Sequence, residues 1–417
     1  MHVKPTVTYK PDKSHSADYI TASAHTNNLW LYGTCTGKVL AHSNNAFYEY
    51  TSHVQSFDYL ESMEIAENVC ALEVHDNGNG RMMVVSANER NIRIDEVEVG
   101  RNDEIVMMGI ECTDGKDEEG VDCDFDHNLD GTAERTSVNT THILTTPACT
   151  TPELHPIPAC TTPSPAIHTI TPTPSPAIHT ITPTPINTAL VSELDAHSYN
   201  IHSLSLRNHF LLSSDYFCID IHNIHRMKQS VLNLINIKPA NLDNLGSVIT
   251  KCTYFSYDTF LYALSSGRIY LNDMRASVQS KRTHQFSYQP DSYREILSAV
   301  SDISVVDDRS FVARNLNTVV LYDVRNDKSH VETYEVFKAD AKSIQRVCTQ
   351  ELVYERMHCV YDCGRIVTGD FDGNFYVFGM DGERVCVKGE GMAKVIGCKG
   401  DDIAVCGDAV RYYKMYE

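Results

Sequence analysis

The chain has few basic residues and no long apolar run. Its 417 residues include 35 Lys and Arg against 55 Asp and Glu, which gives a formal net charge of −20 at pH 7. A protein that binds nucleic acid needs a concentrated basic face, and no such cluster of Lys and Arg occurs here. Apolar stretches stay far below the roughly 18 residues of a membrane span, and residues 1–18 lack the apolar core of a signal peptide. We therefore expect a cytoplasmic or nuclear protein that binds neither nucleic acid nor membranes.

The sequence also lacks the motifs that mark disulfide frameworks and common active sites. Its 14 Cys include no C-x-x-C pair, so we interpret them as reduced thiols. The motifs G-x-S-x-G, Walker A, H-E-x-x-H and G-x-G-x-x-G are all missing. The sequence therefore predicts a protein that is not an enzyme and that binds no cofactor.

Acidic residues and prolines are concentrated in one part of the chain. Residues 95–134 hold 15 Asp and Glu against two basic residues, and residues 147–185 hold eleven of the 15 prolines. PSPAIHTITPT begins at Pro163 and again at Pro174, an 11-residue period that is too short for a packed repeat. Such a composition cannot bury enough apolar surface to offset the entropy lost on ordering. We therefore predict a disordered, acidic and Pro/Thr-rich insert over residues 99–190, between folded parts at residues 1–98 and 191–417.

Short β-branched and aromatic runs recur in the folded parts, where helical periodicity is nearly absent. The clearest runs are NIRIDEVEV from Asn91, FCIDIHNI from Phe217, GRIYLNDMR from Gly267, NTVVLYDVR from Asn317 and GNFYVFGMDG from Gly373. The last three begin 50 and 56 residues apart, near the roughly 40–45 residues of a four-stranded propeller blade. The folded residues suffice for about seven such blades. We predict an all-β, seven-bladed WD40-type propeller, with a β-sandwich as the alternative.

Two further features fit a propeller. The third strand of such a blade often ends in Trp-Asp, and Asn272-Asp273 and Tyr322-Asp323 occupy that place here. Propellers usually complete one blade from both chain ends. We therefore expect the C-terminal segment AVRYYKMYE to pair with the first strand near Tyr19.

One segment of the insert matches part of a calcium-binding loop. Asp126, Asn128, Asp130 and Gly131 have the spacing of the first half of an EF-hand loop. Position twelve of that loop is Ser137 instead of the bidentate Glu, and no amphipathic helix flanks it. A solvated acidic linker is the favoured interpretation.

Histidines and cysteines raise a metal hypothesis that their spacing does not favour. Asp220, His222 and His225 lie close in sequence, but residues i and i+5 of a strand face opposite sides. Cys359 and Cys363 have a spacing seen in metal sites, yet no second pair follows them. We expect structural roles for these side chains and no metal site.

Several segments resemble one known family, and they follow its order and approximate spacing. They are FDYLESMEIAENV (residues 57–69), HSYNIHSLSL (197–206), INIKPANLDNLGSVIT (235–250), LNDMRAS (271–277), EILSAVSDIS (295–304), VETYEV (331–336) and VTGDFDGNFYVF (367–378). The first two look like the family signatures FDYLKSLEIEEKI and HTYHINSISI. On these segments the chain resembles the WD40-type regulatory B subunit, of the 55-kDa class, of protein phosphatase 2A.

The resemblance implies a function and partners. Members of this family join a HEAT-repeat scaffold subunit and the catalytic subunit of protein phosphatase 2A, and they select phosphoprotein substrates without being enzymes themselves. The family also grips the scaffold with an arm, and this chain has its insert in that place. A general WD40 interaction scaffold in another assembly is the alternative. A propeller enzyme with polar residues converging on the central channel is a more remote one, because sequence alone cannot show such convergence.

The resemblance also implies which residues bind substrate. The family's substrate-binding positions correspond here to Tyr199, Asn200, Asp215, Tyr216 and Leu245. Asn200 replaces a His and Tyr216 replaces an Asp, so only part of the family's chemistry is kept. A carboxylate beside an aromatic side chain would suit Arg-bearing motifs, whereas ordinary turn and loop roles are the alternative for Tyr199 and Asp215.

A cluster of aromatic and acidic residues is a weaker candidate for partner binding. Phe57, Asp58, Tyr59 and Leu60 precede a predicted strand. Exposed aromatic residues are typical of protein interfaces, whereas packing within a blade is the alternative.

Overall fold

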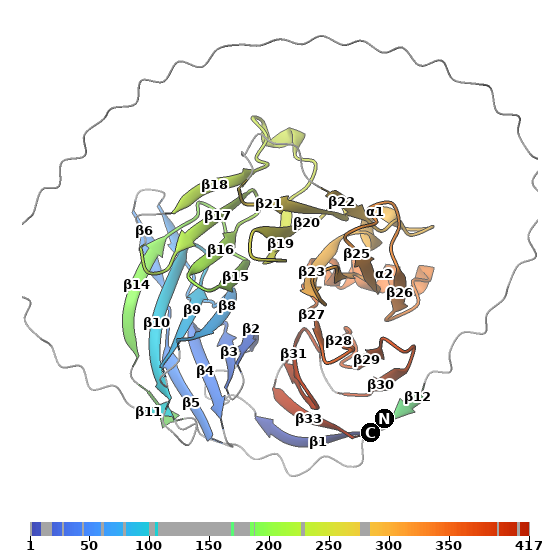
Figure 1. The fold of residues 1–417 in the computed structure, drawn as a ribbon, viewed down its shortest axis with the longest axis horizontal. Helices are drawn as coiled ribbons and strands as arrows, with labels where there is room; N and C mark the ends of the chain where they lie inside the picture. The colour runs from blue at the N-terminus through green and yellow to red at the C-terminus, as the bar shows by residue number, and fades with distance from the viewer. Residues whose placement is uncertain are drawn as a thin grey trace, which may run out of the picture. The chain divides into compact units, whose positions relative to one another are not determined.

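The computed structural model describes most of the chain outside the insert. The described residues are 2–9, 19–26, 29–43, 46–59, 62–77, 81–99, 105–106, 168–170, 184–186, 188–226, 230–275, 284–389, 392–406 and 409–416. Their strands form seven sheets of four or five strands and one hairpin. The prediction of an all-β, seven-bladed propeller is confirmed (Figure 1).

The first four blades are formed by successive groups of strands, each group in chain order. They are β2 (Ile20–His25), β3 (Trp30–Thr34), β4 (Lys38–Ser43) and β5 (Ala46–Thr51); β8 (Ala71–Asp76), β9 (Arg81–Ala87), β10 (Asn91–Val99) and β14 (Ala189–Asp195); β15 (Ser203–Arg207), β16 (Phe210–Ser214), β17 (Cys218–Asn223) and β18 (Val231–Asn236); and β19 (Ile249–Tyr254), β20 (Thr259–Leu264), β21 (Arg268–Asp273) and β22 (His284–Ser287).

The last three blades follow the same pattern until the chain ends. They are β23 (Val300–Val305), β24 (Ser310–Asn315), β25 (Thr318–Asp323) and β26 (Glu332–Glu335); β27 (Cys359–Asp362), β28 (Arg365–Gly369), β29 (Phe375–Gly379) and β30 (Arg384–Val387); and β31 (Val395–Lys399), β32 (Asp402–Cys406) and β33 (Val410–Tyr416) with β1 (His2–Tyr9). The first strand of each blade contacts the first strands of both neighbouring blades, so β2, β8, β15, β19, β23, β27 and β31 enclose a central channel.

Strand β1 closes the ring by completing the seventh blade. It pairs antiparallel with β33, from His2 opposite Tyr416 to Tyr9 opposite Val410. The expected partner, the strand near Tyr19, is instead the inner strand β2 of the first blade, where it pairs with β3. Because β2 already pairs with β3 in the first blade, the strand that closes the ring comes from residues upstream of β2.

The insert lies within the second blade, before its outermost strand. Strand β14 follows the insert and pairs antiparallel with β10, so the folded part resumes no later than Ala189. Three short strands fall inside residues 99–190: β11 (Ile105–Val106) on β10, β12 (His168–Ile170) on β30 and β13 (Thr184–Pro185) on β5. Residues 107–167 and 171–183 of the predicted disordered segment, with the loop that resembles half an EF-hand, lie outside the described residues.

The five strands predicted most clearly are the third strands of their blades: β10, β17, β21, β25 and β29. At the Trp-Asp position, Asp273 and Asp323 each hold the turn that follows. Asp273 accepts hydrogen bonds from the backbone N–H and the guanidinium of Arg275, at 2.9 and 2.7 Å. Asp323 binds Arg325 in the same way, so D-x-R is a local turn motif here.

Blades adhere to each other through apolar side chains on their facing surfaces. Between the fourth and fifth blades, the ring of Phe286 lies 5.2 Å from that of Phe311 and 5.8 Å from that of Tyr322. Some contacts are close enough to require glycine: a Cβ on Gly369 would lie 2.0 Å from the carbonyl oxygen of Ala393. Alternate residues of a strand pack on opposite neighbours: Val320 and Tyr322 of β25 belong to one apolar cluster, and Val319 and Leu321 belong to another. The core therefore continues around the ring.

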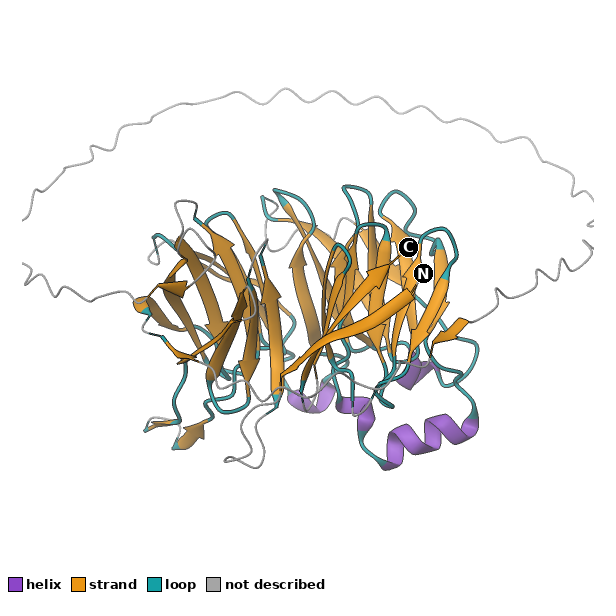
Figure 2. Cartoon of the chain, turned by 90° about the horizontal axis from the view of Figure 1, so that it is seen from below, coloured by secondary structure: helices purple, strands orange, loops and turns teal. Residues whose placement is uncertain are grey.

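One face of the propeller carries nearly all of the larger connections. We call it the connecting face: the links from one blade to the next and the turns between second and third strands lie there, because successive strands are antiparallel. Its links contain the hairpin of β6 (Ser56–Asp58) and β7 (Met63–Ile65), and the helices η2 (Leu242–Asn244), α1 (Arg294–Leu297), α2 (Ala341–Thr349) and η3 (Leu352–Tyr354). Figure 2 shows the helices together on this side of the strands. None of the described helices is long and apolar enough to cross a membrane.

Candidate functional site

The five residues predicted to bind substrate all lie on the connecting face around the third blade. Tyr199 and Asn200 belong to the link between β14 and β15, Asp215 and Tyr216 to the turn between β16 and β17, and Leu245 to the link between β18 and β19. The backbone joins these segments, since the N–H of Ile249 donates to the carbonyl oxygen of Tyr216 at 2.8 Å.

Tyr199 forms a partly exposed aromatic ledge. Its ring contacts that of Phe217 edge-on at 4.8 Å, and the ammonium of Lys238 lies 4.9 Å from its centre. Leu245 is exposed at the end of η2, beside the exposed Leu242. This part of the face therefore offers apolar surface and a cation. The expected match to an Arg-bearing motif assumed a carboxylate beside Tyr199 and did not include this cation.

Asp215 does not face solvent. Asp215 is only 2% exposed. One of its carboxylate oxygens accepts from the backbone N–H of Phe217 at 2.7 Å and from that of Cys218 at 2.6 Å. The other oxygen accepts from Nδ1 of His197 at 3.2 Å. In this structure the carboxylate holds the turn that carries Tyr216, as in the alternative interpretation of an ordinary turn residue. Contact of Asp215 with a substrate stays a prediction.

The histidines near Asp215 form a buried hydrogen-bond chain. The hydroxyl of Ser213 lies 2.8 Å from Nε2 of His197 and 3.0 Å from Nε2 of His222. Nδ1 of His222 lies 3.2 Å from the hydroxyl of Ser230. Burial lowers the pKa of His222 to about 4, with the charge of His197 acting in the same direction. Every ring nitrogen of the two imidazoles has a partner in this chain, since each hydroxyl can both donate and accept.

The hydrogen-bond chain of His197, Ser213 and His222 bears on the metal hypothesis. His197, Asp220 and His222 bring possible ligand atoms within 4.8 Å of one another. Asp220, however, accepts from the backbone N–H of Asn233 at 2.6 Å, and His225 is remote from the group and contacts His209 at 4.4 Å. His222 occupies the Trp position of the Trp-Asp pair, with Asn223 after it. The hydrogen bonds of these side chains fit a structural network in the blade. The absence of a metal ion stays a prediction.

The central channel opens on the connecting face as a cavity of about 380 Å³. Its lining comes from the start of the first strand in all seven blades: Tyr19–Thr21, Asn68 and Cys70, Asn200–His202, Thr250 and Lys251, Ser301 and Asp302, Tyr354–Arg356 and His358, and Lys394. Tyr216 completes the lining. Two predicted substrate residues, Asn200 and Tyr216, therefore face this cavity, which we call the channel mouth.

The carboxylates of the channel mouth are already neutralised. Asp302 lies 3.1 Å from the ammonium of Lys251 and 3.5 Å from Nδ1 of His358, and it accepts from the N–H of Cys359 at 2.9 Å. Burial opposes ionisation of Asp302, but these partners outweigh it and hold the pKa of the carboxyl well below its usual range. Glu355 pairs with Lys394 at 2.5 Å.

Arg356, in contrast, forms no ion pair with any carboxylate of the described residues. Its guanidinium donates to the carbonyl oxygen of His202 at 3.2 Å, and burial lowers its pKa. Several polar atoms of the lining residues also have no hydrogen-bond partner among the described residues, but they are closed off from the cavity: both ring nitrogens of His202, Oγ1 of Thr250 and Oδ1 of Asn68. The channel mouth is thus polar and holds one cation that has no carboxylate partner in the described part of the chain.

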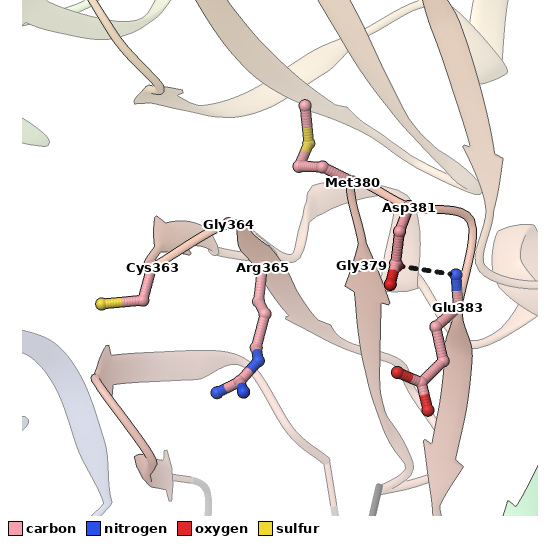
Figure 3. Close-up of a pocket in the computed structure, with 7 residues that line it drawn as sticks. All are labelled: Cys363, Gly364, Arg365, Gly379, Met380, Asp381 and Glu383. Atoms are coloured by element: carbon pink, nitrogen blue, oxygen red, sulfur yellow. Dashed lines mark hydrogen bonds between the residues drawn. The ribbon is translucent and has the colours of Figure 1, made fainter. Parts of the chain in front are cut away.

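A second cavity, of about 510 Å³, lies on the opposite face and is lined by two turns of the sixth blade (Figure 3). Asp381 accepts from the backbone N–H of Glu383 at 3.1 Å, which holds one of these turns. The cation of this cavity, Arg365, pairs with Asp401 at 3.0 Å. The described cation of this cavity is therefore already paired, which makes it the weaker candidate for an anionic ligand.

The aromatic cluster predicted for partner binding is exposed. Phe57 is 44% exposed and Tyr59 is 85% exposed, and their rings are in contact at 5.0 Å. Asp58 anchors the hairpin through a 2.7 Å ion pair with Arg90. Arg90 also donates to the carbonyl oxygen of Ser198, at 3.5 Å, so the hairpin lies next to the Tyr199 segment. Leu60 lies outside the described residues.

Sequence reasoning missed the charged lining of the channel mouth. Lys251, Asp302 and Arg356 come from three blades and are separated by about fifty residues at each step, from 251 to 302 to 356. A single charged residue at the start of a strand carries no signal that it faces a channel. Lys238 was inside a quoted segment, but only the structure places it over Tyr199.

Comparisons with known proteins identify the fold. No known family profile matches the chain. The WD40 β-propeller domain of Doa1 is similar, with a TM-score of 0.55 at 11% identity over 100% of this chain and 98% of that one. The Neurospora crassa Pan2 WD40 domain has a TM-score of 0.54 at 7% identity, covering 100% and 96%. Chaetomium thermophilum Raptor has a TM-score of 0.55 at 9% identity, covering 99% of this chain and 29% of that protein. At these identities the likeness shows the fold alone: the chain is a seven-bladed propeller of the WD40 type, an architecture that typically serves as a scaffold for protein interactions.

Proposed function

We propose that this chain is a non-catalytic regulatory subunit of a protein phosphatase 2A holoenzyme. In this role it binds the HEAT-repeat scaffold subunit and the catalytic subunit, and it selects phosphoprotein substrates with its connecting face. The observation that carries the proposal is the placement of the resembling segments 57–69, 197–206 and 235–250. These segments are far apart in sequence, yet Arg90 and Lys238 connect them on a single face.

The β6–β7 hairpin is the proposed contact for the partner subunits. Val54, Phe57, Tyr59 and Met63 are all exposed large apolar side chains on or next to this hairpin. Exposed aromatic side chains close together are typical of interface hot spots, since they bury much area at little entropic cost. The ion pair of Asp58 with Arg90 supports this role, because it fixes the hairpin while leaving both rings accessible.

The Tyr199 ledge is the proposed contact for substrates. Tyr199, Tyr216 and Leu245 supply apolar and aromatic surface, and Asn200 supplies a polar edge. Lys238 over the Tyr199 ring favours an acidic residue in the bound motif. Asp215 acts by holding the turn that presents Tyr216.

Affinity purification of the full chain tests the proposal. Tagged protein is expected to co-purify with a HEAT-repeat scaffold subunit and a phosphatase catalytic subunit at physiological salt. The double variant Phe57→Ala/Tyr59→Ala is expected to lose most of both subunits, whereas Phe210→Ala/Tyr257→Ala, which removes two exposed rings from the opposite face, keeps them. Wild-type protein that captures neither subunit would refute the proposal.

A general WD40 interaction scaffold in another assembly is the second candidate. It is favoured by the departures Asn200 and Tyr216 and by the insert in place of the family's scaffold-gripping arm. Tyr199→Ala/Leu245→Ala separates the two candidates when the subunits still co-purify. Slower dephosphorylation of client proteins by the purified complex supports the regulatory subunit, and an unchanged rate supports the scaffold.

A further inference from the structure

The channel mouth has the composition of an anion site in a strongly acidic protein. Three cations line it, Lys251, Arg356 and Lys394, and each of its two carboxylates already pairs with a lysine. Arg356 is left with one hydrogen bond, to the carbonyl oxygen of His202. A guanidinium has five N–H donors, so most of its capacity is unused in the described structure.

The other polar side chains of the cavity leave Arg356 as its main free donor. Both ring nitrogens of His202, Oγ1 of Thr250 and Oδ1 of Asn68 have no hydrogen-bond partner among the described residues, but these atoms are closed off from the cavity and a ligand there does not reach them. Burial and the charge of Arg356 hold the pKa of His202 well below its usual value, so its ring is neutral and adds no second charge beside the guanidinium.

The geometry points to a binding site for a phosphate monoester at the channel mouth, with Arg356 as its principal ligand. A phosphate monoester has several acceptor oxygens, enough for the guanidinium fork of Arg356 and for the ammonium groups of Lys251 and Lys394. The cavity of about 380 Å³ is of the size that holds small-molecule ligands, roughly 300–1,000 Å³. A monocarboxylate would leave most of these donors unmet.

This site goes beyond the proposed regulatory role, because it needs neither the scaffold nor the catalytic subunit. The same chemistry can come from a free phosphate-bearing metabolite or from the phosphorylated side chain of a bound client. Its failure is therefore separate from a failure to bind the phosphatase subunits.

Isothermal titration calorimetry on the full chain tests the site with three probes: inorganic phosphate, glycerol phosphate and a short phosphoserine peptide. Wild-type protein is expected to bind at least one probe at millimolar concentration or below. Arg356→Gln is expected to bind it at least about tenfold more weakly, since a charge-assisted fork is lost. Arg365→Gln is the matched control: it removes a guanidinium from the other cavity, one that is paired with Asp401, and it should bind like wild type.

The outcomes separate the two sources and can overturn the site. Tighter binding of the phosphopeptide than of glycerol phosphate, with no binding of its unphosphorylated form, assigns the site to a client side chain; the reverse order assigns it to a free metabolite. No heat with any probe, or equal weakening in both Arg variants, overturns the proposal. Phosphate should also raise the melting temperature of wild type but not of Arg356→Gln, and Arg356→Lys, which keeps the charge without the fork, should lie between them.

Discussion

The hydrogen-bond chain of the third blade and the channel mouth are two polar clusters built from the same kinds of residue. In the chain, His197, Ser213, Asp215 and His222 have a partner for every side-chain nitrogen and oxygen. In the channel mouth, Arg356 pairs with no carboxylate of the described ranges and makes one hydrogen bond, to the carbonyl oxygen of His202. A closed network, whose groups are all paired, stabilises the fold, whereas a guanidinium with spare donors at a cavity is available to a ligand.

The comparison also separates two roles for residues on the same loops. Asp215 and Tyr216 are neighbours in one turn. The carboxylate of Asp215 accepts hydrogen bonds inside the blade, whereas Tyr216 lines the channel mouth. We therefore expect substitutions in the closed network to lower stability, and substitutions at the channel mouth to change binding with little loss of stability.

Asp215→Ala should have the largest effect on folding. It removes a buried carboxylate that accepts from the N–H groups of Phe217 and Cys218 and from His197. Three donors are then left without a partner, and the free energy of unfolding should fall by about 3–4 kcal/mol. Urea denaturation measures this change.

Asp308→Ala is the control for this experiment, because its side chain is exposed and its contact with Arg309 is long, 3.8 Å. It should alter the free energy of unfolding by less than about 0.5 kcal/mol. Equal effects of the two substitutions would mean that Asp215 is not part of a closed network.

Glu73→Gln should reveal the cost of burying a charge on the inner strand β8. Burial raises the pKa of Glu73 from 4.5 to about 7, against the opposing effect of Lys251. Below pH 4.5 the carboxyl is protonated in both folded and unfolded chains and costs nothing. As pH rises from 4.5 to 7, the unfolded chain loses this proton first, so the wild-type fold is progressively destabilised. The Gln variant has no carboxyl to ionise at this position. Its free energy of unfolding should therefore exceed that of wild type by roughly 2–3 kcal/mol at pH 8 and equal it at pH 4.

Unfolding curves across this pH range provide the measurement, and Glu335→Gln on the exposed outer strand β26 provides the control. Its stability should run parallel to wild type at every pH. A Glu73→Gln curve that also runs parallel would show that Glu73 ionises in the folded protein as it does in the unfolded chain.

The blades could be predicted from sequence because each is local. Alternation in runs such as NTVVLYDVR fixes which side chains face the neighbouring blades, and turn residues fix where the strand ends. Ring closure was only partly predictable, because any strand with an unpaired edge could accept β33. Only the assembled ring shows that β2 pairs with β3 as the inner strand of the first blade and that β1 is the partner of β33. The outer strand of the second blade was hidden for the same reason, since β14 is separated from β10 by the insert.

The site was less predictable than the fold. Resemblance placed Tyr199, Asn200, Tyr216 and Leu245 on one face, but an Asp that binds a ligand and an Asp that caps its own turn have the same local sequence, so the burial of Asp215 had no signal. The channel mouth depends on the convergence of seven blades, and no spacing along the chain encodes which first-strand residues meet.

Ser213→Ala should have a smaller effect, and it sharpens the distinction between a structural network and a metal site. The hydroxyl of Ser213 joins His197 and His222, so its loss leaves two buried imidazole nitrogens unpartnered and should cost about 1–2 kcal/mol in urea denaturation. In a metal site, His197, Asp220 and His222 would be the ligands and Ser213 would be dispensable. Zinc should therefore leave the melting temperature of the wild-type protein unchanged. A higher melting temperature with zinc, together with an unaltered stability of Ser213→Ala, would show that these side chains bind a metal ion and do not form a closed hydrogen-bond network.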